Sequence, residues 1–414
     1  MTSSNRTRVL LVVLGAIVAP VAGLLAMLLM AAVVPVPVVF LSAGLLVLFL
    51  VGWLMARLGR LRRGVLFAAG WSVALGLAFS LLFLRPFPDQ PVAAVPAGVA
   101  FWSLPDGTRL AYVHSPATGD ARQLVPVVFL HGGPGTPHEG LPYGTKELNA
   151  AGYDVYSYDQ IGAGRSTRLK DVTKYTVARN VADLDAVRTA IKADRMIVIG
   201  QSWGGSLAAQ YLAAHPDRVA KVAFTSPGEI WPKAHPETEV SPWNRLTGAD
   251  KQRYDSLVSA PRFLFQAVLL GINPRAAHAV VGDAEADSRL HEIALTGRGL
   301  GGCAGGPEGT GHNNPQGFYT NQLTNADFDQ IADPRPVLRT LKTPALVLRA
   351  ECDYVPWVDT REYRDTLPGA TMVYIPGAGH GITGQAGPAY LNAITRFLAG
   401  QPLTAYKGDA DPAG

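Results

Sequence analysis

The sequence predicts an α/β domain with a mostly parallel sheet, preceded by three membrane-spanning helices. Long uncharged apolar stretches fill the first 85 residues, and beyond residue 100 short apolar runs alternate with segments of helical periodicity. The 414-residue chain is 48% hydrophobic and only 16% charged, a composition unlike that of disordered or coiled-coil proteins.

Two uncharged runs define the expected membrane segments. The run from Val9 to Ala56 is long enough for two crossings of roughly 20 residues each, with Pro35 and Pro37 supplying the turn between them. Gly64–Leu84 gives a third crossing, so a cleaved signal peptide, whose apolar region is short, is disfavoured. We expect an anchor over residues 1–85 with spans at about 9–33, 36–56 and 64–84, followed by a Pro-rich linker over 86–98.

The arginines predict the orientation of the anchor. Residues 1–98 hold seven of the 36 basic and one of the 32 acidic residues, so the remaining chain carries 29 basic and 31 acidic residues. Arg6 and Arg8 precede the first span and four arginines separate the second from the third, which places these ends in the cytoplasm. The chain then leaves the third span on the outer face of the cell membrane, with Arg85 as a contrary charge. A nearly neutral remainder gives no reason to expect nucleic-acid binding.

The region after the linker alternates strands and helices. We expect buried strands in five apolar runs and helices in three amphipathic ones, with a final short strand at TMVYI. The alternation is interrupted by an irregular, Gly- and Pro-rich stretch that predicts a mainly helical cap. The expected divisions are a core of residues 99–228 and 340–400, a cap of residues 229–339, and a flexible tail of residues 401–414.

A nucleophile is predicted at Ser202, within Gly200-Gln201-Ser202-Trp203-Gly204. The motif G-x-S-x-G between a buried strand and a helix is typical of a sharp turn that lifts the serine hydroxyl above the sheet. In that arrangement an acid and then a histidine follow along the chain. Asp353 directly follows the strand PALVLRA, and His380 lies in the loop IPGAGHG after TMVYI. His380 would take the proton of Ser202, and Asp353 would orient and stabilise the imidazole.

Acyl transfer also requires donors for the developing oxyanion. The glycine-rich sequence HGGPG begins at His131, after the strand VPVVFL. We expect the backbone N–H groups of Gly133 and Trp203 to form the oxyanion hole, and His131 to brace the loop.

These motifs resemble the proline iminopeptidase family of α/β-hydrolases. HGGPG, DQIGAGRS (Asp159–Ser166), GQSWGG, the late aspartate and GAGHG occur in the family's order between about Ala100 and Leu398. The resemblance implies an α/β-hydrolase fold and a serine aminopeptidase that needs no metal or cofactor. Its substrates would be peptides or small amides, cleaved at the N-terminus and often next to proline. The chain departs from many members at Ile161, where they carry arginine, and in its membrane anchor.

The family resemblance also suggests how a substrate is held. Acidic cap residues bind the substrate's α-amino group in such aminopeptidases, and Glu229, Glu237 and Glu239 lie in the corresponding region. Glu229 is our expected ligand, a solvated cap carboxylate being the alternative. An esterase with the same triad is a second hypothesis for the activity, and a membrane sensor using the domain as a binding module is a third. Protein partners are not predicted.

The two cysteines, Cys303 and Cys352, lie in the cap and beside Asp353. Outside the membrane a disulfide can form and persist, but two cysteines do not establish the geometry, and the sequence leaves their pairing open. They do not predict a metal site.

Overall fold

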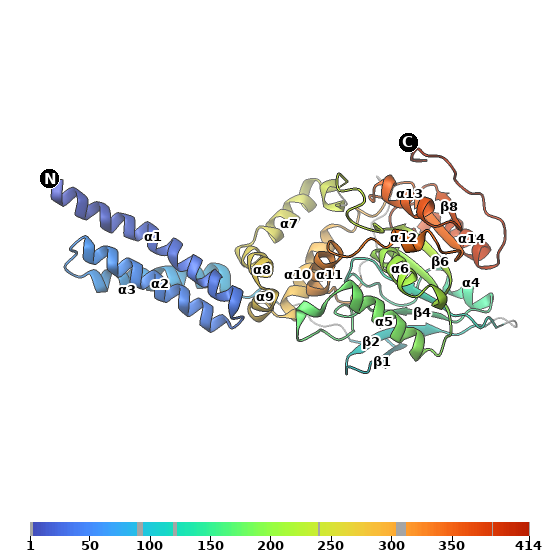
Figure 1. The fold of residues 1–414 in the computed structure, drawn as a ribbon, viewed down its shortest axis with the longest axis horizontal. Helices are drawn as coiled ribbons and strands as arrows, with labels where there is room; N and C mark the ends of the chain where they lie inside the picture. The colour runs from blue at the N-terminus through green and yellow to red at the C-terminus, as the bar shows by residue number, and fades with distance from the viewer. Residues whose placement is uncertain are drawn as a thin grey trace. The chain divides into compact units, whose positions relative to one another are not determined.

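The computed structural model describes residues 3–88, 94–118, 122–238, 241–303, 312–382 and 384–413. The chain forms two compact units (Figure 1). The first, which we call the anchor unit, combines residues 1–89 with residues 254–285. The second, the hydrolase unit, combines residues 90–253 with residues 286–414. A segment in the middle of the expected cap therefore packs with the N-terminal helices.

Three long helices dominate the anchor unit. They are α1 (Ser3–Val33), α2 (Pro37–Leu58) and α3 (Gly64–Phe79), which continues as the π-helical η1 (Ser80–Leu84). Within the described part of the chain, the segments Arg6–Val33, Pro37–Leu58 and Gly64–Leu84 are long and apolar enough to cross a membrane. They agree with the predicted spans. Pro37 is the first residue of α2, a position at which the missing N–H of proline costs no helical hydrogen bond.

Glycines allow α1 and α2 to pack closely. A Cβ on Gly23 would lie 2.8 Å from the carbonyl oxygen of Gly44, and one on Gly44 would lie 2.8 Å from the Cβ of Met27. Small residues at such contacts bring helix backbones together and are the usual means of helix association in lipid.

The segment 254–285 adds α8 (Pro261–Ile272) and α9 (Pro274–Val280) to the anchor unit, with the end of α7 (Gly248–Val258) and the start of α10 (Asp283–Thr296). Side chains at both ends of α8 bond to the long helices. Arg262 Nη1 donates to the carbonyl of Phe83 (3.2 Å), and Asn273 Nδ2 donates to the carbonyl of Ala31 (2.9 Å). These bonds attach α8 to the ends of the first and third helices.

An eight-stranded sheet, in the order β1-β2-β4-β3-β5-β6-β7-β8, forms the core of the hydrolase unit. The pairs from β4 to β8 are parallel, whereas β1 and β2 form an antiparallel hairpin at one edge. The strands are β1 (Val99–Ser103), β2 (Arg109–Ser115), β3 (Val127–Leu130), β4 (Val155–Tyr158), β5 (Met196–Ser202), β6 (Val219–Pro227), β7 (Ala345–Ala350) and β8 (Ala370–Ile375).

The apolar runs predicted as strands correspond to β3 to β7. Every residue of β3 and of β7 is buried, as expected for strands covered on both faces. The remaining helices are α4 (Thr145–Ala150), α5 (Val177–Ala190), α6 (Trp203–Ala214), α11 (Phe318–Phe328), α12 (Arg335–Leu338), α13 (Trp357–Thr366) and α14 (Gly387–Leu398).

Helices cover both faces of the sheet. On one face, Leu148 of α4 and Phe397 of α14 join a buried cluster that includes Ala223 of β6. The next residue, Phe224, points to the other face and packs on Tyr363 of α13, with 4.5 Å between ring centroids. The carboxyl ends of the parallel strands meet at one edge, where open α/β sheets place their binding sites.

Residues 401–413, where the sequence predicts a flexible tail, follow β8 and α13 instead. The Tyr406 N–H donates to the carbonyl of Met372 (2.7 Å), and Trp357 Nε1 donates to the carbonyl of Asp409 (2.9 Å). Arg349 Nη2 bonds to Asp411 Oδ2 at 2.7 Å. Several of these bonds use backbone groups of the tail, so a small, polar composition gave no sign of them.

Candidate active site

Ser202 occupies a sharp turn between β5 and α6. Its φ of +55° is one that non-glycine residues rarely adopt. The flanking glycines make this turn possible: a Cβ on Gly200 would lie 2.1 Å from the carbonyl oxygen of Gly204, and one on Gly204 would lie 2.3 Å from that of Leu130. The turn has the form of a nucleophile elbow, in which a strained serine is held above the sheet edge.

The structure brings Asp353 and His380 together at the same edge. Asp353 follows β7 and His380 follows β8, and His380 Nδ1 lies 2.7 Å from Asp353 Oδ1. Both residues are buried. Because the carboxylate accepts only, Nδ1 carries the proton, which leaves Nε2 free to act as a base.

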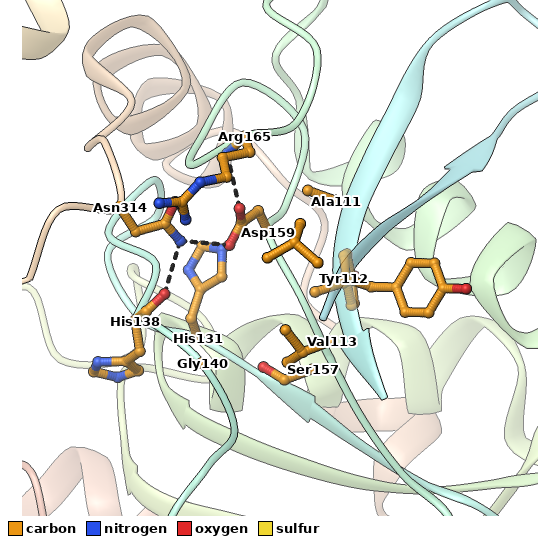
Figure 2. A pocket seen from close by; sticks show the side chains of 12 residues that line it. Ala111, Tyr112, Val113, His131, His138, Gly140, Ser157, Asp159, Arg165 and Asn314 are labelled. Carbon is orange, nitrogen blue, oxygen red and sulfur yellow. Dashed lines mark hydrogen bonds between the residues drawn. The ribbon is translucent and has the colours of Figure 1, made fainter. Parts of the chain in front are cut away.

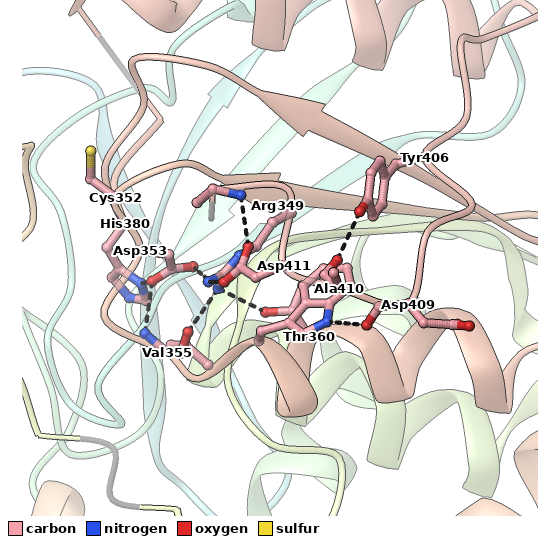
Figure 3. A network of polar contacts seen from close by, with 12 residues as sticks. Arg349, Cys352, Asp353, Val355, Thr360, His380, Tyr406, Asp409, Ala410 and Asp411 are labelled. Carbon is pink, nitrogen blue, oxygen red and sulfur yellow. Dashed lines mark hydrogen bonds and ion pairs between the residues drawn. The ribbon is translucent and has the colours of Figure 1, made fainter.

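The surroundings of Asp353 keep its carboxylate ionised. Burial alone would raise its pKa, but the charge and hydrogen bond of His380, the Val355 N–H and the charge of Arg349 hold the pKa below its usual range. Arg349 lies behind the carboxylate, with Nη1 3.9 Å from Asp353 Oδ2 and Nη2 bonded to Asp411 (Figure 3). The C-terminal tail thus supplies the counter-charge of this arginine.

Tyr354 contacts both His380 and Ser202. Its ring lies on the imidazole of His380, with 4.1 Å between centroids, and its hydroxyl shares a hydrogen bond with Ser202. Burial, and then the charge of Asp353, raise the pKa of Tyr354 to about 12, so its hydroxyl stays protonated and can donate. Tyr354 therefore covers His380 and restrains the Ser202 hydroxyl.

The HGGPG loop lies against Ser202 from the end of β3. A Cβ on Gly132 would be 2.9 Å from that of Ser202, and Gly133 has a φ of +114°, a value that favours glycine. Trp203 begins α6, so its backbone N–H is one of the unpaired donors of that helix terminus. Gly132 thus brings the loop beside Ser202, and Trp203 directly follows Ser202 at the start of α6, while the oxyanion-hole role of Gly133 and Trp203 stays a prediction.

His131 braces this loop, as predicted. Its Nε2 accepts from the N–H of Gln160 (3.0 Å) while Nδ1 donates to the carbonyl of Gly132 (2.9 Å). Burial lowers the pKa of His131 to about 3, so the ring is neutral and suited to both bonds. Gln160 in turn accepts from Trp203 Nε1 (2.9 Å), which links the loop to the start of α6.

A small polar pocket lies beside His131 (Figure 2). Asp159 accepts from the backbone N–H of Arg165 and from Asn314 Nδ2, both at 2.8 Å, and Asn314 Nδ2 also donates to the carbonyl of His138 (2.7 Å). These bonds join the DQIGAGRS segment to the segment that precedes α11. The arrangement supports the HGGPG loop and leaves little room for a ligand.

The two cysteines form a disulfide. It connects the segment after α10 to the loop of Asp353, and Gly301 in that segment packs against Gly379, where a Cβ would lie 2.0 Å from the Gly301 carbonyl oxygen. Arg245 adds a second link, donating to the carbonyls of Cys352 (3.1 Å) and Asp353 (3.2 Å). The loops that carry Asp353 and His380 are therefore fixed from the cap side.

A group of carboxylates lies next to this site. Glu229 follows β6, one residue after Gly228, whose N–H donates to the carbonyl of Ser202 (2.9 Å). Burial and the charges of Asp329 and Glu362 raise the pKa of Glu229, while burial, Glu229 and Glu362 raise that of Asp359 to about 7. Glu362 bonds to Arg335 through Oε1 (2.6 Å), whereas its buried Oε2 has no partner among the described residues.

We call Glu229, Asp359 and Glu362 the carboxylate cluster. The other two acidic residues considered above are less informative: Glu237 lies at the periphery of the cluster, and Glu239 falls outside the described residues. No group of three potential metal ligands occurs among the residues that the structure describes.

Sequence reasoning missed several residues of the site. Tyr354 follows the predicted acid directly, and its position was a usable signal. Arg245 and Glu362 gave no such signal, because only the fold brings them to the site. In the sequence, Asp359, like Asp333, is a nearby alternative to Asp353 for the acid, and only the position of Asp353 at the end of a strand separates them.

Comparisons with known proteins identify the family of the fold. Residues 125–383 match the family described as alpha/beta hydrolase fold. A proline iminopeptidase of Heyndrickxia coagulans is 42% identical over 102 residues, which are 25% of this chain and 35% of that protein. One of Levilactobacillus brevis is 37% identical over 118 residues, 27% of this chain and 40% of that protein. The matched segments thus span well under half of these relatives.

Among solved structures, a proline iminopeptidase of Mycobacterium smegmatis aligns with 73% of this chain and 98% of its own, with 20% identity and a TM-score of 0.46. The family match covers more than half of the chain, and it includes the segments that carry Ser202, Asp353 and His380. The chain belongs to the α/β-hydrolase fold family.

Proposed function

We propose that this protein is a membrane-anchored serine hydrolase that removes N-terminal residues from peptides or small amides. The observation that carries the proposal is the arrangement of Ser202, Asp353 and His380 at one sheet edge, with the 2.7 Å bond between the acid and the base. The partial likeness to proline iminopeptidases favours amides as substrates.

The reaction follows from these positions. Ser202 Oγ attacks the substrate carbonyl while His380 Nε2 takes its proton, and Asp353 stabilises the imidazolium. The N–H groups of Gly133 and Trp203 bond to the oxyanion. His380 then gives the proton to the leaving amine, which leaves an acyl-enzyme. Water attacks the acyl carbon, losing its proton to His380, which returns it to Ser202.

The carboxylate cluster favours an aminopeptidase over an esterase. Ionised carboxylates that are partly buried and repel one another gain from a cation between them, and a substrate ammonium group supplies one. Glu229 is our candidate for the direct contact, since its neighbour Gly228 is bonded to the backbone of Ser202. An ester without an amino group would draw no benefit from this cluster.

The anchor would hold the enzyme on the outer face of the cell membrane. The arginines at the ends of the helices favour this orientation. A reporter fused after Gly98 tests it, since activity of a cytoplasm-specific reporter at that site would reverse the topology.

A fluorophosphonate probe tests the nucleophile directly. We expect the wild-type protein to be labelled and Ser202→Ala not to be. Ser226→Ala is a matched control, since Ser226 also has a positive φ and is the next-to-last residue of the neighbouring strand, yet its buried hydroxyl has no partner among the described residues. Labelling of Ser202→Ala would refute the proposed mechanism.

Substrates divide the two hydrolase hypotheses. We expect prolyl and alanyl arylamides with a free amino group to be cleaved faster than their N-acetylated forms. Turnover of short-chain aryl esters alone would favour the esterase. A wild-type protein that neither reacts with the probe nor cleaves either substrate class would favour the binding module.

A further inference from the structure

A large apolar cavity, open on one side, is formed by the helices of the anchor unit. Its volume is about 640 Å³, within the range of roughly 300–1,000 Å³ typical of ligand sites. Its walls come from α1, α2, α3, η1 and α8, and nearly all of the lining side chains are apolar. Three aromatic rings form one wall, where Phe265 of α8 lies 5.3 Å from Phe79 and 6.0 Å from Phe83, centroid to centroid.

Ordered water is not expected to fill this cavity. A water molecule needs two to four polar partners, which an apolar lining does not provide. Because the cavity is open on one side, an apolar molecule from the surroundings can enter it and contact its walls. An apolar guest is therefore expected.

Helix α8 buries its polar residues and presents apolar side chains to the cavity. Its polar residues Arg262 and Gln266 are 5% and 1% exposed, whereas Leu264 and Val268 are 49% and 47% exposed. This is the reverse of a helix on a water-soluble surface. Arg262 forms a buried ion pair with Glu285, in which Nη2 lies 2.7 Å from Oε2. Leu264 and Val268 line the cavity, so the exposed apolar face of α8 is one that an apolar guest would cover.

The cavity lies at one end of the three long helices. Its lining comes from the second half of the first span, the first half of the second and the second half of the third. All of these halves lie away from the arginine-rich ends, so the cavity belongs to the outer half of the bilayer in the orientation proposed above.

One cation lies directly at this end. Arg85 follows Leu84, which lines the cavity, and its side chain is exposed. It has no hydrogen bond or ion pair to any residue in the described part of the chain. A basic group at the outer end runs against the usual distribution of charge around membrane helices, which suggests a specific anionic partner.

We propose that the cavity binds one acyl chain of an anionic phospholipid of the outer leaflet, with the lipid phosphate at Arg85. The apolar walls would contact the acyl chain, and the Arg85 side chain would pair with the negative charge of the headgroup. This inference goes beyond hydrolysis and rests on the proposed membrane anchoring and its orientation.

The test uses the full-length protein in phosphatidylcholine vesicles that contain phosphatidylglycerol with a photoactivatable diazirine in one acyl chain. We expect cross-links to α3 and α8, located by mass spectrometry. Gly76→Leu extends a side chain into the cavity, because a Cβ there meets only Leu45 Cδ2 at 3.1 Å. It should lower cross-linking about tenfold, since each displaced methylene is worth roughly fourfold in affinity.

Gly70→Leu is the matched control on the same helix, since a Cβ on Gly70 meets nothing within 4 Å and Gly70 does not line the cavity. Equal cross-linking of the two variants would overturn the acyl-chain site. Arg85→Gln should remove the preference for phosphatidylglycerol over an equally labelled phosphatidylcholine, and an unchanged preference would overturn the assignment of the headgroup.

Carbonate extraction separates this inference from the proposal on which it rests. Extraction of the protein into the soluble fraction would refute the anchoring itself. Retention in the membrane with unselective cross-linking would refute only the lipid site. Fluorophosphonate labelling of each variant shows whether the hydrolase unit remains folded.

Discussion

Two buried aspartates, six residues apart in the chain, have pKa values that shift in opposite directions. Asp353 faces His380 and has Arg349 behind it, and its pKa is lowered. Asp359, on α13, faces Glu229 and Glu362, and its pKa is raised to about 7. Both are buried, so burial does not distinguish them. The charge of the neighbouring groups therefore determines the direction of each pKa shift, since an opposite charge lowers the pKa of a carboxylate and a like charge raises it.

The comparison separates two uses of a buried carboxylate. On the Asp353 side each charge meets an opposite charge, which fixes the geometry of the acid and the base. On the Asp359 side the carboxylate cluster has excess negative charge, and a cationic group of a substrate would relieve it. Substitutions on the two sides test this difference.

Removing the charge of Asp353 should have the largest effect. With Asp353→Asn the amide nitrogen can donate to Nδ1, which favours the wrong tautomer of His380, and kcat should fall about 10⁴-fold. Steady-state turnover of an alanyl arylamide measures this. Asp359→Asn is the control and should retain kcat within a few-fold. Similar losses in both variants would erase the distinction between the two aspartates.

The disulfide should strongly stabilise the loop that carries Asp353. Closing a loop of 49 residues is worth about 4 kcal/mol in the chain-entropy account. The double variant Cys303→Ser/Cys352→Ser should therefore lower the melting temperature, and reducing agent should have the same effect on the wild type but none on the variant. Unchanged melting of reduced protein would mean that Arg245 and the packing of Gly301 on Gly379 suffice to hold the loops.

Glu229→Gln should weaken recognition of the amino group. A hydrogen bond to a charged group contributes about 1.5–3 kcal/mol, so kcat/KM for a free-amine arylamide should fall roughly 10- to 100-fold. The N-acetylated substrate is the control and should be unaffected. A matched variant, Glu237→Gln at the periphery of the cluster, should change neither. Equal losses on both substrates would assign Glu229 a structural role instead.

Asp359 should make stability depend on pH. Its pKa of about 7 in the folded protein exceeds the value of about 3.9 in an unfolded chain. The resulting destabilisation is absent below pH 4, grows between pH 4 and 7, and is complete above pH 7. Asp359→Asn should thus raise the melting temperature at pH 8, by about 2–4 °C for each kcal/mol recovered, and leave it unchanged at pH 4. An equal change at both values would exclude titration as the cause.

The sequence indicated the parts of this molecule that depend on local pattern. The apolar runs located β3 to β7 and the three long helices, because strands buried on both faces and helices long and apolar enough to cross a membrane both need unbroken apolar residues. The glycines around Ser202 identified a sharp turn, since no other residue fits at Gly200 or Gly204.

The parts that escaped prediction depend on contacts between distant segments. The hairpin of β1 and β2 at the sheet edge was not assigned, although PDG between two alternating runs is a turn signal. The packing of residues 254–285 with the long helices could not be foreseen, because Arg262 and Glu285 are ordinary surface residues until they meet. The disulfide needed the path of the cap, which two cysteines alone do not reveal.

The inverted helix α8 has a practical consequence for anyone who wants the hydrolase unit without the three long N-terminal helices. Cutting the chain in the linker removes Phe83 and Phe87, whose backbone groups bond to Arg262 and Glu285. It leaves α8 behind, with Leu264, Phe265 and Val268 uncovered in water. Such a shortened protein should aggregate or bind detergent until residues 254–285 are also redesigned or replaced by a short loop.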